Sequence, residues 1–330
     1  MIWLTFFVSA AVIVLAAVKL AEYGDAIGYR TGLGSMFIGT LLVASATSLP
    51  ELLTAINSIR QDVVDLAAGG MLGSNMFNMF LLGLLSLLFF RQRVLRRVAM
   101  KHALSGSVAM FVIGLATFFI MARLRLRIGW IGPDGLLVAG ASAAGMWLIW
   151  ANAPGSPSAP SAPAPEAEGI PSLRRALVGF TLAAAVLVLA SPHLVRSSAA
   201  IANVTGLSAG FIGTLALAMI TSLPELVTII AAVRLGAHDL AVGNLFGSNI
   251  FNMFALGLTD LFYIRGPLLS AISPDLALVG LLGLLLTGIG LIGNQARLDR
   301  LIWVVELDGI LLVVGYLVGL GFLYLRGIGL

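Results

Sequence analysis

Two copies of one short motif place a carboxylate inside an apolar part of the chain. Thr-Ser-Leu-Pro-Glu occurs at 47–51 and again at 221–225, so Glu51 and Glu225 each lie within a long run of mostly apolar residues. An ionised acid at the middle of a bilayer costs at least about 2.5 to 3.5 kcal/mol unless a partner neutralises it. Such residues indicate a functional site, and a protonated Glu that joins helices by hydrogen bonds is the structural alternative.

Hydroxyl and amide side chains accompany both carboxylates at helical spacing. Residues three and four apart share a helix face. Two clusters are expected on this basis, Thr47 with Ser48 and Glu51, and Thr221 with Ser222 and Glu225. A second repeated motif, Gly-Ser-Asn-x-Phe-Asn, adds the i, i+4 pairs Ser74 with Asn78 and Ser248 with Asn252. Asn75 and Asn249 lie on another face, and we predict packing or hydrogen-bonding roles for them.

The oxygen atoms of these residues suit hard cations. Ca²⁺ takes about 6 to 8 oxygen ligands and Na⁺ accepts the same kind of group, whereas soft transition metals prefer His or Cys. The two carboxylates balance the charge of one Ca²⁺ or of two monovalent ions. If the empty, doubly charged site cannot move between the two membrane faces, transport in one direction needs a different cation for the return.

A proline in each motif is expected to break the helix that carries it. Pro50 and Pro224 have no N–H, which frees the carbonyls of Ala46 and Ile220 four residues earlier. Irregular backbone at membrane depth is tolerated only where protein buries it or where it lines a cavity. The motifs are therefore predicted to lie at the centre of the protein, away from lipid.

The composition is that of a membrane protein. Of 330 residues, 59% are hydrophobic and only 10% are charged, whereas a soluble domain carries about 25% charged residues. A helix that crosses a bilayer needs roughly 20 mostly apolar residues. Ten such stretches are predicted, near 2–20, 36–58, 66–90, 102–122, 134–151, 174–192, 207–232, 240–263, 273–293 and 302–325. We expect an all-α polytopic protein.

The chain divides into two similar halves. Residues 152–171 are rich in Pro, Ala and Ser and predict a flexible linker between residues 1–151 and 172–330. When Glu51 is aligned with Glu225, the segments 39–83 and 213–257 match without a gap and 26 of 45 positions are identical. Five spans in each half require the second copy to enter the membrane from the opposite side. Inverted repeats of this kind are typical of transporters, with a site near the midplane between the repeats.

The paired motifs resemble the alpha repeats of the cation/calcium antiporter superfamily, most closely its sodium/calcium exchanger branch. The resemblance implies two inverted five-helix repeats and exchange of Ca²⁺ for Na⁺ by alternating access. It assigns ion-ligand roles to the side chains of Ser48, Glu51, Ser74, Asn78, Ser222, Glu225, Ser248 and Asn252. It assigns further roles to the backbone carbonyls of Thr47, Thr221, Ala44 and Ala218.

One position departs from the pattern of the superfamily. In the pattern of the superfamily, many members carry an Asn in the first repeat and an Asp in the second. Here both residues, Asn78 and Asn252, are amides. The central site then carries two formal charges, which leaves proton-coupled and K⁺-dependent cation exchange as alternatives. The proton-coupled branch of the superfamily carries a Gly-Asn-x-x-Glu motif at the corresponding place. This chain lacks that motif, which favours Na⁺ over H⁺ as the counter-ion.

Other classes of function fit the sequence less well. A passive cation channel would not need the inverted, paired broken helices. An intramembrane enzyme would need a base for Ser48 or Ser222, and His102, His193 and His238 all lie at the ends of predicted spans. No Cys is present, which excludes disulfides, and no cofactor is expected.

Charge distribution predicts the location and the orientation of the protein. The basic residues lie at span ends beside lipid headgroups, so the lipid bilayer is the expected partner and nucleic acid is not. Twelve of the 19 Lys and Arg fall in the loops that face inward when both termini are outside. The positive-inside rule therefore favours this orientation, in a prokaryotic plasma (inner) membrane.

Overall fold

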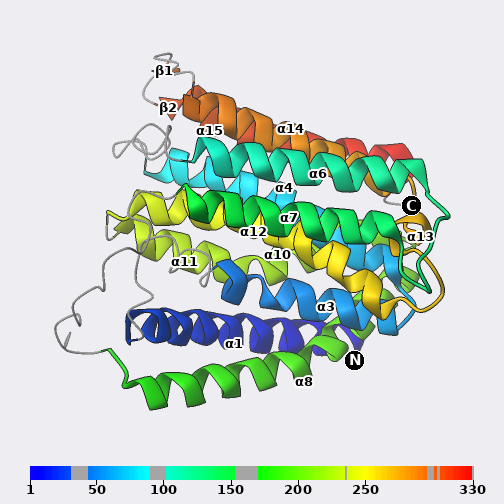
Figure 1. The fold of residues 1–330 in the computed structure, drawn as a ribbon, viewed down its shortest axis with the longest axis horizontal. Coiled ribbons are helices and arrows are strands. Elements are labelled where there is room, and N and C mark those ends of the chain that lie inside the picture. The colour runs from blue at the N-terminus through cyan, green and yellow to red at the C-terminus, as the bar shows by residue number, and fades with distance from the viewer. Residues whose placement is uncertain are drawn as a thin grey trace.

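The structure consists almost entirely of helices that run side by side. It is a computed structural model that describes residues 1–30, 44–89, 102–152, 170–234, 236–295, 301–302 and 305–328. Most of the predicted linker and the first part of the predicted second span lie outside these ranges. The ribbon in Figure 1 shows the long helices aligned with one another, α1 beside α8 along one edge and α14 and α15 at the opposite edge.

The described elements follow one another in two series. Those of the first half are α1 (Ile2–Arg30), α3 (Leu49–Arg60), α4 (Val64–Leu88), α6 (Ala103–Ala122) and α7 (Pro133–Ala151). Those of the second half are α8 (Leu173–Thr205), α9 (Ala209–Ile212), η2 (Gly213–Leu217), α10 (Ala218–Thr221), α11 (Leu223–Arg234), α12 (His238–Thr259), η3 (Asp260–Phe262), α13 (Leu268–Ala271), α14 (Leu276–Gln295), α15 (Leu307–Leu323) and η4 (Tyr324–Ile328). Residues 44–47 are also helical.

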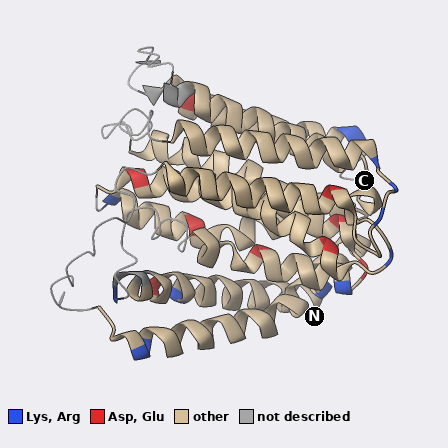
Figure 2. Ribbon diagram, viewed as in Figure 1, with Lys and Arg blue, Asp and Glu red and all other residues tan. Residues whose placement is uncertain are grey.

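The protein is an integral membrane protein by the length and the apolar character of its helices. Within the described ranges, seven helices are long and apolar enough to cross a bilayer, and the bent pair Ala209–Thr221 and Leu223–Arg234 makes eight if it is one span. Figure 2 shows Lys and Arg concentrated at the two ends of the helix bundle. Those ends are where charged side chains reach the headgroups and water.

Several predicted boundaries were wrong. The helix predicted near 174–192 extends over 33 residues as α8, because its Pro192 is accommodated within the helix. At 1.5 Å per residue, it is about 50 Å long. The last helix begins at Leu307 and not near 302, because Leu301–Ile302 (β1) pairs antiparallel with Val305–Glu306 (β2). This pair and the isolated bridge between Ile128 and Ile131 are the departures from an all-α fold in the described parts of the chain.

The two halves fold alike in the register of the sequence repeat. In the alignment that places Glu51 on Glu225, helices α3 and α11 begin and end at matching positions, as do α4 and the continuous segment α12–η3. The turns that precede α4 and α12 also match, with left-handed backbone at Asp62 (φ 65°) and at Gly236 (φ 77°). Helices α7 and α15 begin at matching positions as well. The repeat predicted from the sequence is therefore matched in secondary structure, while the count of ten spans and the inverted arrangement remain predictions.

The centre of the bundle is built by close crossings of α4. This helix is the most buried of the apolar helices, with 78% of its most apolar window inside the protein. It packs against α12, α14 and α15, and also against η2. A Cβ atom on Gly73 would lie 2.6 Å from the Cα and O atoms of Thr214, so the absence of a side chain allows this approach. The crossing brings the two repeated motifs together.

Candidate cation site

Each carboxylate motif lies at a break in a helix. Ser48 interrupts the first helix with φ −87° and ψ 5°, and Ser222 interrupts the second with φ −91° and ψ 5°. The second helix also contains the π-helical turn η2 and bends by 41° at the break. Pro50 and Pro224 are the second residues of α3 and α11, where a missing N–H leaves fewer backbone bonds across the break. The predicted helix breaks are confirmed.

The carboxylates are bonded across the two repeats. Ser48 Oγ donates to Glu225 Oε1 over 3.1 Å, and Ser222 Oγ donates to Glu51 Oε1 over 3.1 Å. Ser248 Oγ, on α12, lies 3.4 Å from the same oxygen of Glu225. The exposed fractions of the Glu51 and Glu225 side chains are 3% and 1%, so protein encloses both. One site therefore contains both acids, and each repeat supplies hydroxyls to the other.

Five buried oxygen atoms of the predicted ligands have no hydrogen-bond partner among the described residues. The group consists of Glu51 Oε2, Glu225 Oε2, Asn78 Oδ1, Asn252 Oδ1 and Ser74 Oγ. Buried polar atoms are normally satisfied, and an unpaired one costs about 1 to 3 kcal/mol. These are also the atom types that coordinate Ca²⁺ and Na⁺. A cation bound beside such atoms would satisfy them.

The amides of the second motif form crossed pairs. Asn78 Nδ2 donates to Asn249 Oδ1 over 2.9 Å, and Asn252 Nδ2 donates to Asn75 Oδ1 over 3.0 Å. The pairs join α4 to α12, and all four side chains are at most 1% exposed. The hydrogen-bonding role predicted for Asn75 and Asn249 is confirmed.

The carbonyls of Ala44 and Ala218 and the side chains of Thr47 and Thr221 take part in bonds within their own helices. The Ala44 carbonyl accepts from Ser48 N at 2.9 Å and from Thr47 Oγ1 at 3.1 Å. The Ala218 carbonyl accepts from Ser222 N at 3.0 Å and from Thr221 Oγ1 at 3.4 Å. Their roles as ion ligands stay predictions, because these carbonyls already accept two hydrogen bonds each.

The sequence predicted a set of site residues but not how the serines and the acids pair. Helical spacing grouped Ser48 with Glu51 and Ser222 with Glu225, whereas the bonds given above join each Ser to the Glu of the other repeat. The helix is interrupted at each Ser, and at Ser222 it bends by 41°, so spacing along a regular helix does not predict the partner of the Glu. The repetition of the motif was the one signal that could have suggested reciprocal pairing.

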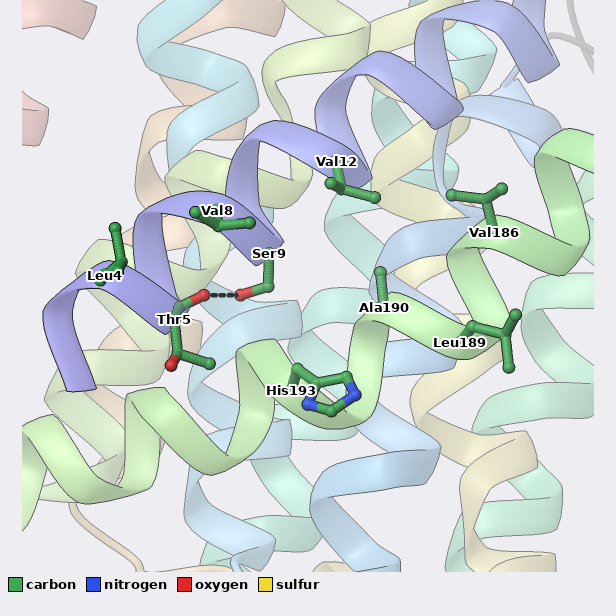
Figure 3. Close-up of a pocket in the computed structure, with 9 residues that line it drawn as sticks. All are labelled: Leu4, Thr5, Val8, Ser9, Val12, Val186, Leu189, Ala190 and His193. Atoms are coloured by element: carbon green, nitrogen blue, oxygen red, sulfur yellow. Dashed lines mark hydrogen bonds between the residues drawn. The ribbon is translucent and has the colours of Figure 1, made fainter. Parts of the chain in front are cut away.

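A cavity lies away from the carboxylates. Figure 3 shows a groove between α1 and α8, lined mainly by aliphatic residues such as Val12 and Leu189, with a volume of about 510 Å³. His193 lines it from within α8, which continues past the end predicted near residue 192. The groove has a mostly apolar lining and contains no carboxylate. It therefore lacks the groups that would hold a cation.

The crossed serine bonds lead to a measurable expectation. Replacing Ser48 or Ser222 with Ala removes one hydrogen bond to a buried carboxylate, worth about 1.5 to 3 kcal/mol when the acceptor is charged. We expect each variant to bind Ca²⁺ or Na⁺ with roughly tenfold lower affinity, because the carboxylate is no longer held in place. Calorimetric titration of the purified protein measures this change.

Ser142→Ala is the matched control for the serine variants. Ser142 is a fully buried serine on α7 whose Oγ donates to Val138 O in its own helix over 2.8 Å. Unchanged cation binding is expected for this variant. Equal losses in all three variants would contradict the role of the crossed bonds.

Comparison with known families and relatives gives a consistent result. The family described as sodium/calcium exchanger protein matches residues 1–141 and 175–325. The chain is 29% identical over 263 residues to the inner membrane protein YrbG of Escherichia coli, covering 77% of this chain and 78% of that protein. It is 29% identical over 258 residues to the putative antiporter CaxA of Alkalimonas amylolytica, covering 76% and 78%.

Solved structures share the fold at low sequence identity. The H⁺/Ca²⁺ exchanger CAX matches with a TM-score of 0.67 and 15% identity, over 99% of this chain and 89% of that chain. The sodium-calcium exchanger NCX_Mj matches with a TM-score of 0.60 and 19% identity, over 97% of this chain and 99% of that chain. The two solved proteins differ in the counter-ion that their names give, so the likeness identifies the fold and not the ion.

Proposed function

Because the chain belongs to the sodium/calcium exchanger protein family, we propose that it is a secondary antiporter that exchanges Ca²⁺ for Na⁺ across a membrane. The observation that carries the proposal is the enclosed site in which Glu51 and Glu225 each accept a hydroxyl from the other repeat. Each acid keeps one oxygen without a partner among the described residues. Those oxygens are available to a cation.

The composition of the site supports a cation of this class. Two carboxylates, two amide oxygens and several hydroxyls approach the number of oxygens that Ca²⁺ requires, about 6 to 8. Their two formal charges also balance two Na⁺ ions. An empty site leaves both charges uncompensated in a region of low dielectric, where each is costly. The loaded site is therefore the form that moves between faces, and the two cations exchange because they compete for the same acids.

The packing of the two repeats supports an inverted arrangement. Arg265 Nη1 contacts Asp62 Oδ1 over 2.6 Å, which places the end of α3 beside the end of α12–η3. Helix α11 ends shortly before α12 begins, with only a short turn between them. Matching helices α3 and α11 therefore run in opposite directions along the bundle. This is the relation expected of inverted repeats that open a shared site to either membrane face in turn.

We place the protein in the prokaryotic plasma membrane with both termini outside. In Figure 1, α1 begins and α15 ends at the same end of the bundle. The distribution of Lys and Arg favours the outer face for that end. The Escherichia coli relative, whose name describes an inner membrane protein, supports the same membrane.

Flux measurements test the proposal directly. We expect purified protein in liposomes loaded with Na⁺ to accumulate ⁴⁵Ca²⁺ when the outside medium is free of Na⁺, since Na⁺ efflux drives Ca²⁺ entry. Collapse of the Na⁺ gradient should reduce uptake at least about tenfold, to the level of empty liposomes. The control is the same protein in liposomes with equal Na⁺ on both sides. Uptake that does not depend on an opposed Na⁺ gradient would contradict the proposal.

The same assay separates the alternatives. A pH gradient that drives Ca²⁺ uptake without Na⁺ would indicate proton-coupled exchange, the activity named for the structural relative CAX. A requirement for K⁺ together with Na⁺ would indicate K⁺-dependent exchange. Electrical current without any counter-ion would indicate a passive channel. The absence of the Gly-Asn-x-x-Glu motif favours Na⁺ among these counter-ions.

A further inference from the structure

The four asparagines at the centre of the protein have two different positions in the site. Asn78 and Asn252 each keep an oxygen that has no partner among the described residues. Asn75 and Asn249 use their oxygens to accept the NH₂ groups of Asn252 and Asn78, over 3.0 and 2.9 Å. In each repeat, one asparagine thus faces the site and the one three residues before it bonds the asparagine of the other repeat.

An amide ligand has to be oriented, unlike a carboxylate. Only its oxygen coordinates a cation, while its NH₂ group carries two donors and repels positive charge. A carboxylate has two oxygens and can coordinate with either. Because both positions are amides in this chain, rotation of either amide by half a turn would direct NH₂ at the cation. The site needs a reason for each amide to keep its oxygen inward.

The crossed bonds give that reason. With its oxygen toward Asn252, Asn75 accepts the NH₂ group of that residue, and the Asn252 oxygen is then left without a partner among the described residues. The same holds for Asn249 and Asn78. Rotation of a ligand amide would set oxygen against oxygen across a distance of about 3 Å in a buried place, where an unpaired polar group costs about 1 to 3 kcal/mol. While Asn75 and Asn249 keep their oxygens toward the ligand amides, only one orientation of each ligand amide avoids this contact.

We propose that Asn75 and Asn249 are positioning residues that hold the amides of Asn252 and Asn78 with their oxygens toward the transported cation. They do not contact the cation in this proposal. Each acts on the ligand of the opposite repeat, so α4 and α12 set one another's ligands. The proposal rests on the proposed function, because the oriented oxygens matter only if a cation binds between the repeats.

A double-mutant cycle tests the proposal. Asn75→Leu keeps a side chain of similar size and removes the acceptor for Asn252, so we expect Ca²⁺ binding to weaken roughly tenfold. Asn252→Asp replaces the amide with a carboxylate, which needs no orientation. Adding Asn75→Leu to Asn252→Asp should then change binding less than about twofold, giving a coupling of about 1 kcal/mol or more between the two positions. Equilibrium binding of ⁴⁵Ca²⁺ to protein in detergent measures all four variants.

A purely structural role for Asn75 gives a different pattern. Loss of packing would weaken binding by the same factor whether residue 252 is Asn or Asp, and such additive losses would overturn the proposal. So would normal binding by Asn75→Leu. If Asn75→Leu does not fold, as judged by size-exclusion chromatography, the symmetric cycle of Asn249→Leu with Asn78→Asp gives the same test at the other amide pair.

Failure of the proposed function can be distinguished from failure of the positioning role. Binding in detergent does not require exchange. A wild-type protein that binds Ca²⁺ but exchanges no cations in liposomes overturns the proposed function, while the cycle still decides the positioning role. A wild-type protein that binds and exchanges, with additive losses in the cycle, overturns the positioning role alone. A wild-type protein that binds no Ca²⁺ overturns both.

Discussion

Replacing Glu51 or Glu225 with Gln is expected to abolish cation exchange while the protein stays folded. Each substitution removes one of the two negative charges of an enclosed site and keeps the size of the side chain. A single remaining charge no longer balances Ca²⁺ or two Na⁺ ions. We expect exchange to fall about 100-fold or more, which corresponds to about 2.7 kcal/mol at 1.36 kcal/mol for each factor of ten.

The fold should tolerate these substitutions. The amide oxygen of Gln can still accept the hydroxyl that Ser222 donates to residue 51, and the one that Ser48 donates to residue 225. Burying a neutral amide also costs less than burying a carboxylate. Thermal unfolding in detergent should therefore stay near that of the wild type or move upward, while ⁴⁵Ca²⁺ flux in liposomes is lost.

Glu22→Gln is the control for the charge itself. Glu22 lies on α1, where its exposed carboxylate pairs with Lys19 over 2.6 Å. Flux in this variant should equal that of the wild type. Wild-type flux in Glu51→Gln and Glu225→Gln as well would contradict the assignment of the site.

Replacing Gly73 with Leu is expected to remove both stability and activity. A Cβ atom at this position would lie 2.6 Å from backbone atoms of Thr214 and 3.0 Å from the Ala218 side chain. Backbone at that distance cannot move aside without shifting η2 away from α4. Overpacking costs about 1 to 3 kcal/mol where side chains can adjust, and we expect at least that much here. The shift would also separate Ser74 from the helix that carries Glu225.

Gly140→Leu is the control that separates the effect of a steric clash from the effect of replacing a glycine in a helix. Gly140 lies on α7, and a Cβ atom there would meet nothing within 4 Å. This variant should unfold at the temperature of the wild type or slightly above, since glycine weakens a helix. Both variants can be compared by fluorescence-detected size-exclusion chromatography after heating. Equal behaviour of Gly73→Leu and Gly140→Leu would show that the crossing of α4 with η2 is not tight.

The repeated parts of the fold were predictable from the sequence. The alignment of Glu51 with Glu225 predicted matching halves, and α3 and α11 begin and end at matching positions in that alignment. Helix ends were less predictable where a turn residue determined them. Helix α8 continues past Pro192, beyond the end predicted near residue 192, until Gly206 adopts φ 74°. Hydropathy alone does not distinguish a proline that ends a helix from one that a helix accommodates.

The site was predictable in composition and only partly in geometry. Repetition predicted the acids, hydroxyls and amides, because polar residues that recur in apolar segments are rare. It could not show that Ser48 bonds Glu225, since that contact depends on how two broken helices meet in space. Hydrogen bonds from Asn75 and Asn249 were predicted, but the residues that they bond were not. Contacts between repeats are a property of the packed structure.

The reciprocal bonds of Ser48 and Ser222 also bear on how such a protein could arise. Neither half alone bonds its own acid with these hydroxyls, because each serine bonds the acid of the other half. An ancestor with a single copy of the motif would have built the same arrangement only by associating with a second copy of itself. Duplication and fusion would then have joined an existing pair in one chain.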